Sequence, residues 1–319
     1  MLWQVPDTVR QLVVVLALAA CSRTHTQAVA SDASIDAADA ALPDSATCGT
    51  RAGMRGKTDR MRTVAGLDRT YIVYLPDGVD PKTPVPLVFV AHGYTMSAQD
   101  MYDITGYTQL ADREGIAVAF PNGEAGPSSL GAPWNVGTDV CSSTTGAPPL
   151  ATGDDFAFLD AMKADIAQDQ CLDAAHVYVT GFSMGGYFSH QVGCMRPDIR
   201  AVAPHSGGTH TLDGCANAKE PIIMFHGTAD AVIPESCDTD AAAAWAAHNG
   251  CAMTTTSRTV DNGTCITYDN CPAGGQVELC TFTNMGHCWA GGMGTNIFAC
   301  AGYESATELE WAFFKQYAW

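Results

Sequence analysis

Short runs of apolar and β-branched residues recur along the chain, separated by stretches with the period of amphipathic helices. Near-continuous apolar runs of this length are typical of strands buried on both faces of a parallel sheet. We expect such strands at residues 70–75, 86–91, 116–120, 176–180, 201–204, 221–225 and 277–282.

Helix-period segments lie between these runs. The clearest is predicted to begin at Asp154 or Asp155, because acidic residues suit a helix N-terminus. Its apolar face would consist of Phe156, Leu159, Met162 and Ile166. Further helices are expected at residues 98–114, 184–194, 238–248 and 304–317. The alternation of strands and helices predicts an α/β fold in one domain, with a mostly parallel, doubly wound sheet covered by helices on both faces.

Two long segments rich in Gly, Pro and Ser interrupt this alternation, at residues 122–152 and 250–275. Loops of this length in a compact domain are usually functional or tied by disulfides. We interpret the first as a loop on the substrate side of the molecule, the alternative being a plain surface excursion.

Composition and charge narrow the function classes. The 319 residues can bury a full core, and 47% of them are hydrophobic while 16% are charged. Acidic residues exceed basic ones, giving a formal net charge of −18. Such a charge repels phosphate backbones, so nucleic acid is not expected as a partner.

The N-terminal segment has the features of an export signal. An apolar run at residues 12–20 is too short to span a bilayer but has the length of a signal-peptide core. It ends in Leu-Ala-Ala-Cys21, which looks like a bacterial lipobox, so Cys21 is predicted to carry lipid. We expect a signal peptide at 1–20, a flexible tether rich in Ala, Ser and Asp at 21–47 and a folded domain at 48–319. The protein would then be an envelope lipoprotein whose only membrane contact is its lipid anchor; simple secretion and a short buried helix are the alternatives.

Thirteen cysteines are many for a reduced cytosolic enzyme of this size. Setting Cys21 aside leaves twelve, an even number, and the sequence contains no Cys-x-x-Cys pair. Disulfides fit that pattern better than zinc. The sequence also shows no nucleotide loop, metal-ligand spacing or cofactor motif, so neither metal nor cofactor is expected.

The strongest chemical signal is Gly181-Phe182-Ser183-Met184-Gly185, between a predicted strand and a predicted helix. This context is typical of a nucleophile elbow, in which a sharp turn exposes the serine hydroxyl at the edge of the sheet. Glycines there would remove side chains that clash where helix and strand cross. A glycine-rich turn that only packs closely is the structural alternative.

A serine nucleophile needs a neutral imidazole as base and a carboxylate to orient it. Asp230 and His287 follow the predicted strands at 221–225 and 277–282, in the chain order of this fold, and we predict that they complete a triad with Ser183. Activity should then rise with pH as His287 loses its proton. The competing acids Glu235, Asp238 and Asp240 are interpreted as solvated charges at a helix start. His226 is interpreted as holding its loop by hydrogen bonding.

The sequence also indicates candidate donors to the oxyanion and candidate contacts to the substrate. The amide of Met184 follows the nucleophile, and a second amide should come from the loop after the strand at 86–91, with Tyr94 preferred and Thr95 next. Trp134 and Trp289 are candidates to flank an aromatic acyl group; ordinary core packing is the alternative for both.

These motifs together resemble the serine esterases of carbohydrate esterase family one, which include feruloyl esterases, acetylxylan esterases and polyhydroxybutyrate depolymerase-like lipoproteins. The resemblance covers residues 70–319, an α/β-hydrolase domain, and is most specific at 176–186, 226–230 and 286–289. It implies the same triad of Ser183, Asp230 and His287, and a disulfide between Cys251 and Cys271. Many relatives have Thr where this chain has Cys288, which suggests a local disulfide at the histidine loop.

The sequence thus predicts a monomeric serine carboxylic ester hydrolase that works through an acyl-enzyme. Its substrate would be a small-molecule or polymer-linked ester, with a hydroxycinnamoyl ester of plant cell wall polysaccharide as the first choice. Acetylxylan or hydroxybutyrate esters are the nearest alternatives. A peptidase of similar fold and a non-catalytic surface scaffold represent other classes.

Overall fold

The computed structural model describes Cys48, Arg51 and residues 53–124, 131–137, 140–141, 144, 151–209 and 211–317. The predicted signal peptide, Cys21 and the tether at 21–47 lie outside the described residues, as does much of the segment at 122–152.

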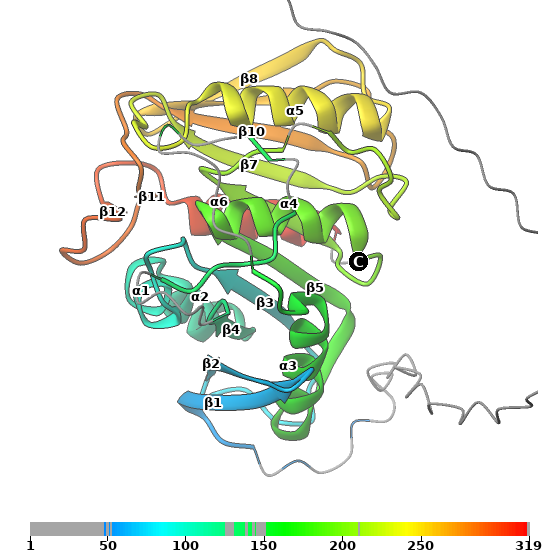
Figure 1. Cartoon of the computed structure of the whole chain (residues 1–319), viewed down its shortest axis with the longest axis vertical. Helices are drawn as coiled ribbons and strands as arrows, with labels where there is room; N and C mark the ends of the chain where they lie inside the picture. The colour runs from blue at the N-terminus through cyan, green and yellow to red at the C-terminus, as the bar shows by residue number, and fades with distance from the viewer. Residues whose placement is uncertain are drawn as a thin grey trace, which may run out of the picture. The chain divides into compact units, whose positions relative to one another are not determined.

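A mixed sheet forms the centre of the domain (Figure 1). Its strands, in spatial order, are β1 (Gly56–Val64), β2 (Leu67–Leu75), β4 (Ala117–Pro121), β3 (Val85–Ala91), β5 (Leu172–Phe182), β6 (Ala201–His205), β7 (Ile222–Gly227), β10 (Val277–Phe282), β9 (Gly263–Tyr268) and β8 (Thr255–Val260). Neighbouring strands from β4 to β10 run parallel, whereas the pairs at both edges are antiparallel. The expected doubly wound sheet is therefore confirmed.

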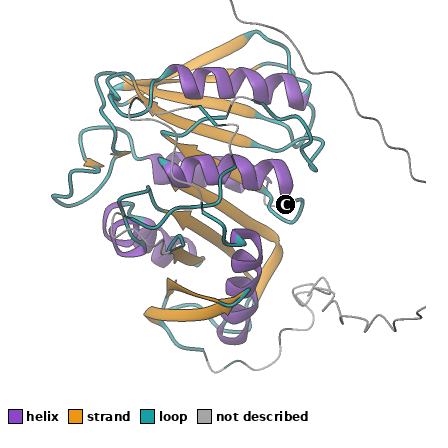
Figure 2. Ribbon diagram, in the orientation of Figure 1, coloured by secondary structure: helices purple, strands orange, loops and turns teal. Residues whose placement is uncertain are grey.

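Helices cover both faces of this sheet (Figure 2). One face packs against α3 (Asp155–Asp169), α4 (Met184–Met195) and α5 (Ser236–Asn249). The other packs against α1 (Ala98–Ile104), α2 (Tyr107–Glu114) and α6 (Ala306–Phe314), which the 3₁₀ turn η2 (Lys315–Tyr317) extends. In Figure 1, α4 and α5 run in front of the sheet and α6 lies behind α4. Burial of each strand on both faces explains the continuous apolar runs in the sequence.

The hydrophobic pattern does not predict three strands of the central sheet, β1, β8 and β9. The segment at 250–275, expected to be a long loop, contains the antiparallel hairpin β8–β9, which pairs Val260 with Gly263 around a two-residue turn. Asn262 in that turn has a φ of 56°, which asparagine tolerates better than most residues. β8 and β1 are edge strands with mostly exposed residues, so they lack the apolar runs that mark the central strands.

The single helix expected at 98–114 is two helices. Ser97 caps α1 in a reciprocal capping box with Asp100, and α1 ends at Thr105. Gly106 follows with a φ of 76°, which turns the chain before α2 begins. In contrast, the helix expected at Asp154 or Asp155 begins as predicted, because the Asp154 side chain accepts a hydrogen bond from the amide of Ala157.

All twelve cysteines from Cys48 onward form disulfides, as the even count predicted. The pairs are Cys48–Cys171, Cys141–Cys237, Cys194–Cys215, Cys251–Cys271, Cys265–Cys280 and Cys288–Cys300. The Cys251–Cys271 pair implied by the family resemblance is among them. No helix in the described ranges is long and apolar enough to cross a membrane.

Candidate active site

Ser183 stands at a strained turn between β5 and α4. Its φ of 56° and ψ of −114° lie outside the regions that residues other than glycine ordinarily occupy. Strain of this kind persists where the surrounding structure enforces it, and it is frequent at functional sites. The amide of Ser183 donates to the carbonyl of His205 on β6, which fixes the turn to the sheet.

The two flanking glycines permit this turn. A Cβ on Gly181 would lie 2.4 Å from the carbonyl oxygen of Gly185, and one on Gly185 would lie 2.3 Å from that of Ala91. Backbone atoms cannot move aside as a flexible side chain can, so any larger residue would displace α4 from the sheet. The steric role that the sequence suggested for both glycines is thus present in the structure.

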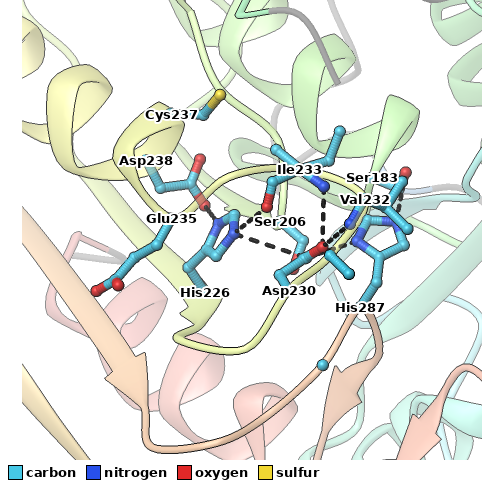
Figure 3. A network of polar contacts seen from close by, with 12 residues as sticks. Ser183, Ser206, His226, Asp230, Val232, Ile233, Glu235, Cys237, Asp238 and His287 are labelled. Atoms are coloured by element: carbon cyan, nitrogen blue, oxygen red, sulfur yellow. Dashed lines mark hydrogen bonds and ion pairs between the residues drawn. The ribbon is translucent and has the colours of Figure 1, made fainter. Parts of the chain in front are cut away.

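The side chains of Ser183, His287 and Asp230 form one hydrogen-bonded chain (Figure 3). The serine hydroxyl lies 2.9 Å from Nε2 of His287, and Nδ1 of His287 lies 2.6 Å from Oδ2 of Asp230. Ser183 follows β5, Asp230 follows β7 and His287 follows β10, so three strands of the parallel part of the sheet place them at its C-terminal edge. Imidazole can therefore accept the hydroxyl proton while the carboxylate holds its other nitrogen.

Asp230 is held as an anion. Its side chain is fully buried, and Oδ1 accepts hydrogen bonds from the amides of Val232 and Ile233 at 2.8 and 2.9 Å. Burial opposes the charged form, but the hydrogen bond from His287 and these two amides hold the pKa of Asp230 below its ordinary value. The carboxylate is thus fixed in position and ready to orient His287.

A ring contact and a neighbouring disulfide hold the histidine loop in place. The ring packs on Phe182, with the centroids 4.7 Å apart, and Cys288 is joined to Cys300. This disulfide also connects the short strands β11 (Trp289–Ala290) and β12 (Ala299–Cys300). The local clamp that the sequence suggested at Cys288 is therefore present.

The candidate oxyanion donors belong to two segments next to the serine, the start of α4 and the turn after β3. Met184 is the first residue of α4, while Tyr94 and Thr95 form the turn after β3. A Cβ on Gly93 would lie 3.2 Å from the Cβ of Ser183, so this turn contacts the nucleophile. The amides of Met184 and Tyr94, with Thr95 as the alternative, remain predicted donors.

Trp134 and Trp289 are core residues, which corrects their interpretation as substrate contacts. Neither is exposed. Trp134 stacks on Phe188 and donates to the carbonyl of His92 at 2.8 Å, whereas Trp289 stacks on His205. Because both rings are covered on their faces by other side chains, neither can flank an acyl group. Trp134 instead supports the turn that carries Tyr94.

Asp238 is not the solvated charge that its place at a helix start suggests. It is fully buried, and its Oδ2 lies 2.7 Å from Nδ1 of His226. His226 holds its loop as expected, with Nε2 3.0 Å from the carbonyl of Ile233. Its position in the first turn of α5 made Asp238 resemble an ordinary helix-start acid, and no spacing in the sequence links it to His226.

Sequence reasoning missed a buried ion pair near the site. Arg69 donates to Oδ1 of Asp155 at 2.6 Å and to the carbonyl of Asn122 at 3.1 Å. Oδ2 of Asp155 accepts from the amide of Asn135 at 2.6 Å. The pair thus ties together the described ends of the segment at 122–152. In the sequence, the adjacent acids at 154–155 indicate a helix start, and nothing in their spacing shows that Asp155 pairs with Arg69.

Cys265, Glu278 and Cys280 are the one cluster in the described residues with the spacing of metal ligands. The two cysteines are joined in a disulfide, which removes the thiolates that a metal would need.

A sheet of this order, with a serine elbow after β5 and an acid and a histidine after β7 and β10, defines an α/β-hydrolase. A sequence profile described as "Esterase PHB depolymerase" matches residues 69–216. A probable feruloyl esterase C of Aspergillus clavatus is 31% identical over 222 residues, covering 66% of this chain and 73% of that protein. The chain belongs to this esterase family, as its motifs indicated.

Feruloyl esterase B of Piromyces equi is 29% identical over 271 residues, covering 78% of this chain but 45% of that protein. The chain therefore spans less than half the length of that relative. Among solved structures, an acetyl xylan esterase from Aspergillus awamori superposes with a TM-score of 0.58 at 16% identity, covering 81% of this chain and 99% of that one. This second likeness concerns the fold alone.

Proposed function

We propose that this protein hydrolyses carboxylic esters with Ser183 as nucleophile, His287 as general base and acid, and Asp230 as the group that orients His287. The observation that carries the proposal is the continuous hydrogen-bonded chain from the Ser183 hydroxyl to the buried Asp230 carboxylate, built on a strained elbow. Family membership supports it independently.

The geometry supports a two-step reaction. Nε2 of His287 takes the proton of Ser183 as the hydroxyl oxygen attacks the ester carbonyl, and the amides of Met184 and Tyr94 stabilise the oxyanion. The same proton then passes to the departing alcohol. In the second step His287 takes a proton from water, whose oxygen attacks the acyl carbon, and then returns that proton to the Ser183 oxygen as the acid leaves. Asp230 stays ionised throughout and compensates the charge of the imidazolium.

A substitution at the nucleophile tests this proposal. Ser183→Ala should lower kcat/KM for a p-nitrophenyl ester by at least about a thousandfold, because removing a triad nucleophile leaves only residual catalysis. It should also abolish labelling by a fluorophosphonate probe. The matched control is Ser257→Ala on the exposed strand β8, which should behave as the parent. Near-normal turnover by Ser183→Ala would refute the scheme, and lack of labelling in the parent protein would favour a non-catalytic scaffold.

For the substrate we propose a hydroxycinnamoyl ester of plant cell wall polysaccharide. The support is the similarity to proteins named feruloyl esterases. Trp134 and Trp289 add no support, because both are buried in the core. Acetylated xylan and 3-hydroxybutyrate oligomers are the nearest alternatives, the latter because of the family description. Initial rates on methyl ferulate, acetylated xylan and soluble hydroxybutyrate oligomers separate the three, and no turnover of ferulate would exclude the first.

We also propose that the protein is exported. Six disulfides are typical of chains that fold in an oxidising compartment. Lipid attachment at Cys21 would keep it at the membrane, and a Cys21→Ala variant should then pass from the membrane fraction to the soluble fraction of expressing cells. We expect the folded domain to be a monomer in both the parent protein and the Cys21→Ala variant.

A further inference from the structure

A second histidine–aspartate pair lies directly behind the catalytic carboxylate (Figure 3). His226 at the end of β7 and Asp238 in the first turn of α5 are both fully buried, and Nδ1 of His226 lies 2.7 Å from Oδ2 of Asp238. Nε2 of the same ring lies 3.0 Å from the carbonyl of Ile233 and 3.6 Å from Oδ2 of Asp230. The network therefore extends beyond the triad by two residues that the proposed mechanism does not use.

The partners of His226 differ in kind from those of three other fully buried histidines, His92, His190 and His205. His92 accepts a hydrogen bond from the amide of Gly123, and His190 accepts one from Trp245. His205 accepts from the amide of Ala290. A ring nitrogen that accepts a hydrogen bond carries a lone pair, so these three rings are neutral.

Both nitrogens of His226 face oxygen atoms that can accept a hydrogen bond. Two N–H groups satisfy both contacts, which makes the ring an imidazolium. The other arrangement, a neutral ring beside a protonated Asp238, would place no positive charge against the Asp230 anion. It would also remove a carboxylate from the N-terminal turn of α5, where the helix dipole favours negative charge.

The charges around His226 agree with this assignment. Asp238 faces it from α5 and Asp230 from the loop after β7, while the neutral ring of His205 lies on β6 and His287 lies beyond Asp230. Burial works against both charged groups and raises the pKa of Asp238 above its ordinary value, but the carboxylates of Asp238 and Asp230 raise the pKa of His226 to about 9.

We propose that His226, held as an imidazolium by Asp238, is a positioning residue for Asp230. Oδ2 of Asp230 lies between Nδ1 of His287 and Nε2 of His226, so a cation behind the carboxylate keeps it ionised and aimed at His287. The pair thereby extends activity toward lower pH. This inference rests on the proposed esterase function.

Asp238→Asn tests the role in activity, because it keeps the shape of the side chain but removes the charge that holds the proton on His226. We expect the acid limb of the kcat/KM profile to move upward by at least about half a pH unit, and kcat to fall about tenfold with KM within about twofold. The matched control is Asp240→Asn, which removes the same charge from an exposed position of the same helix. An unshifted acid limb in Asp238→Asn, or an equal shift in Asp240→Asn, would overturn the proposal.

A measurement independent of catalysis uses the Ser183→Ala protein labelled with ¹⁵N-histidine. Nuclear magnetic resonance should show one buried ring doubly protonated from about pH 5 to 8, assigned to His226 by its loss in His226→Gln. A His226 ring that is neutral at pH 6 would overturn the proposal even if Asp238→Asn fails to fold. If instead Ser183→Ala retained esterase activity, the proposed function would fail while the charge state of His226 would still be measured.

Discussion

Glu310 is an ionisable group enclosed in the core, and its protonation should control how stability depends on pH. It lies on α6 with no exposed surface. Tyr107 donates to its Oε2 at 2.5 Å, and its Oε1 lies 3.0 Å from the hydroxyl of Thr180. That hydroxyl is closer to the carbonyl of Ala203, at 2.7 Å, and has one proton to give. Glu310 therefore satisfies Thr180 best when it is protonated and acts as the donor.

The size of the effect follows from the proton equilibrium. Burial raises the pKa of Glu310 from its ordinary value of 4.5 to about 8, although the contacts with the hydroxyls of Tyr107 and Thr180 favour the ionised form and lower it. Between these values the folded protein holds a proton that the unfolded chain releases, so raising the pH favours unfolding by about 1.4 kcal/mol per unit. At pH 7 the ionisation of the unfolded chain lowers the free energy of unfolding by about 3 kcal/mol relative to acidic solution.

Glu310→Gln removes this dependence, because a glutamine amide can donate to Thr180 while its carbonyl accepts from Tyr107. Urea unfolding of the oxidised protein at several values between pH 4.5 and 8 should show a difference between variant and parent that grows with pH by about 4 kcal/mol over this range. Glu308→Gln on the exposed side of the same helix is the control and should show no such growth. A constant difference between Glu310→Gln and the parent would refute the reasoning.

Two other substitutions test the scaffold of the site. Gly185→Ala should lower the free energy of unfolding by at least about 2 kcal/mol, because its Cβ would lie 2.3 Å from a backbone oxygen; Gly78→Ala, where no atom lies within 4 Å, should change it little in the same denaturant titration. The double variant Cys288→Ala/Cys300→Ala should lower kcat/KM about tenfold by loosening the loop of His287. Equal losses in Cys194→Ala/Cys215→Ala would show a general rather than a local effect.

The central fold was predictable because each buried strand has its own apolar run. The edge strands β1 and β8 were not, since their mostly exposed residues give no such signal. The break between α1 and α2 at Gly106 was missed for a related reason: a helical period continues across a turn that one glycine makes possible. Patterns of hydrophobicity record burial, and they do not record how a chain bends between buried segments.

The sequence likewise predicts some residues of the active site and not others. The positions of Ser183, Asp230 and His287 followed from the order of strands and loops, because parallel strands place their C-terminal ends at one edge. The roles of Trp134 and Asp238 did not follow from the sequence. The Trp134 ring is covered by neighbouring side chains, and the Asp238 carboxylate contacts His226, twelve residues away.

The sequence by itself thus determined the layered fold, the twelve oxidised cysteines and the candidate triad. The fold follows from local hydrophobic patterns, the disulfides from an even number of cysteines, and the triad from the order of its residues along the chain. Only the tertiary structure decided which polar groups are buried and which partners they meet. It placed Glu310 between two hydroxyls and His226 between two oxygens, next to Asp230. Protonation depends on burial and on neighbours within a few ångströms, and those neighbours come from segments far apart along the chain.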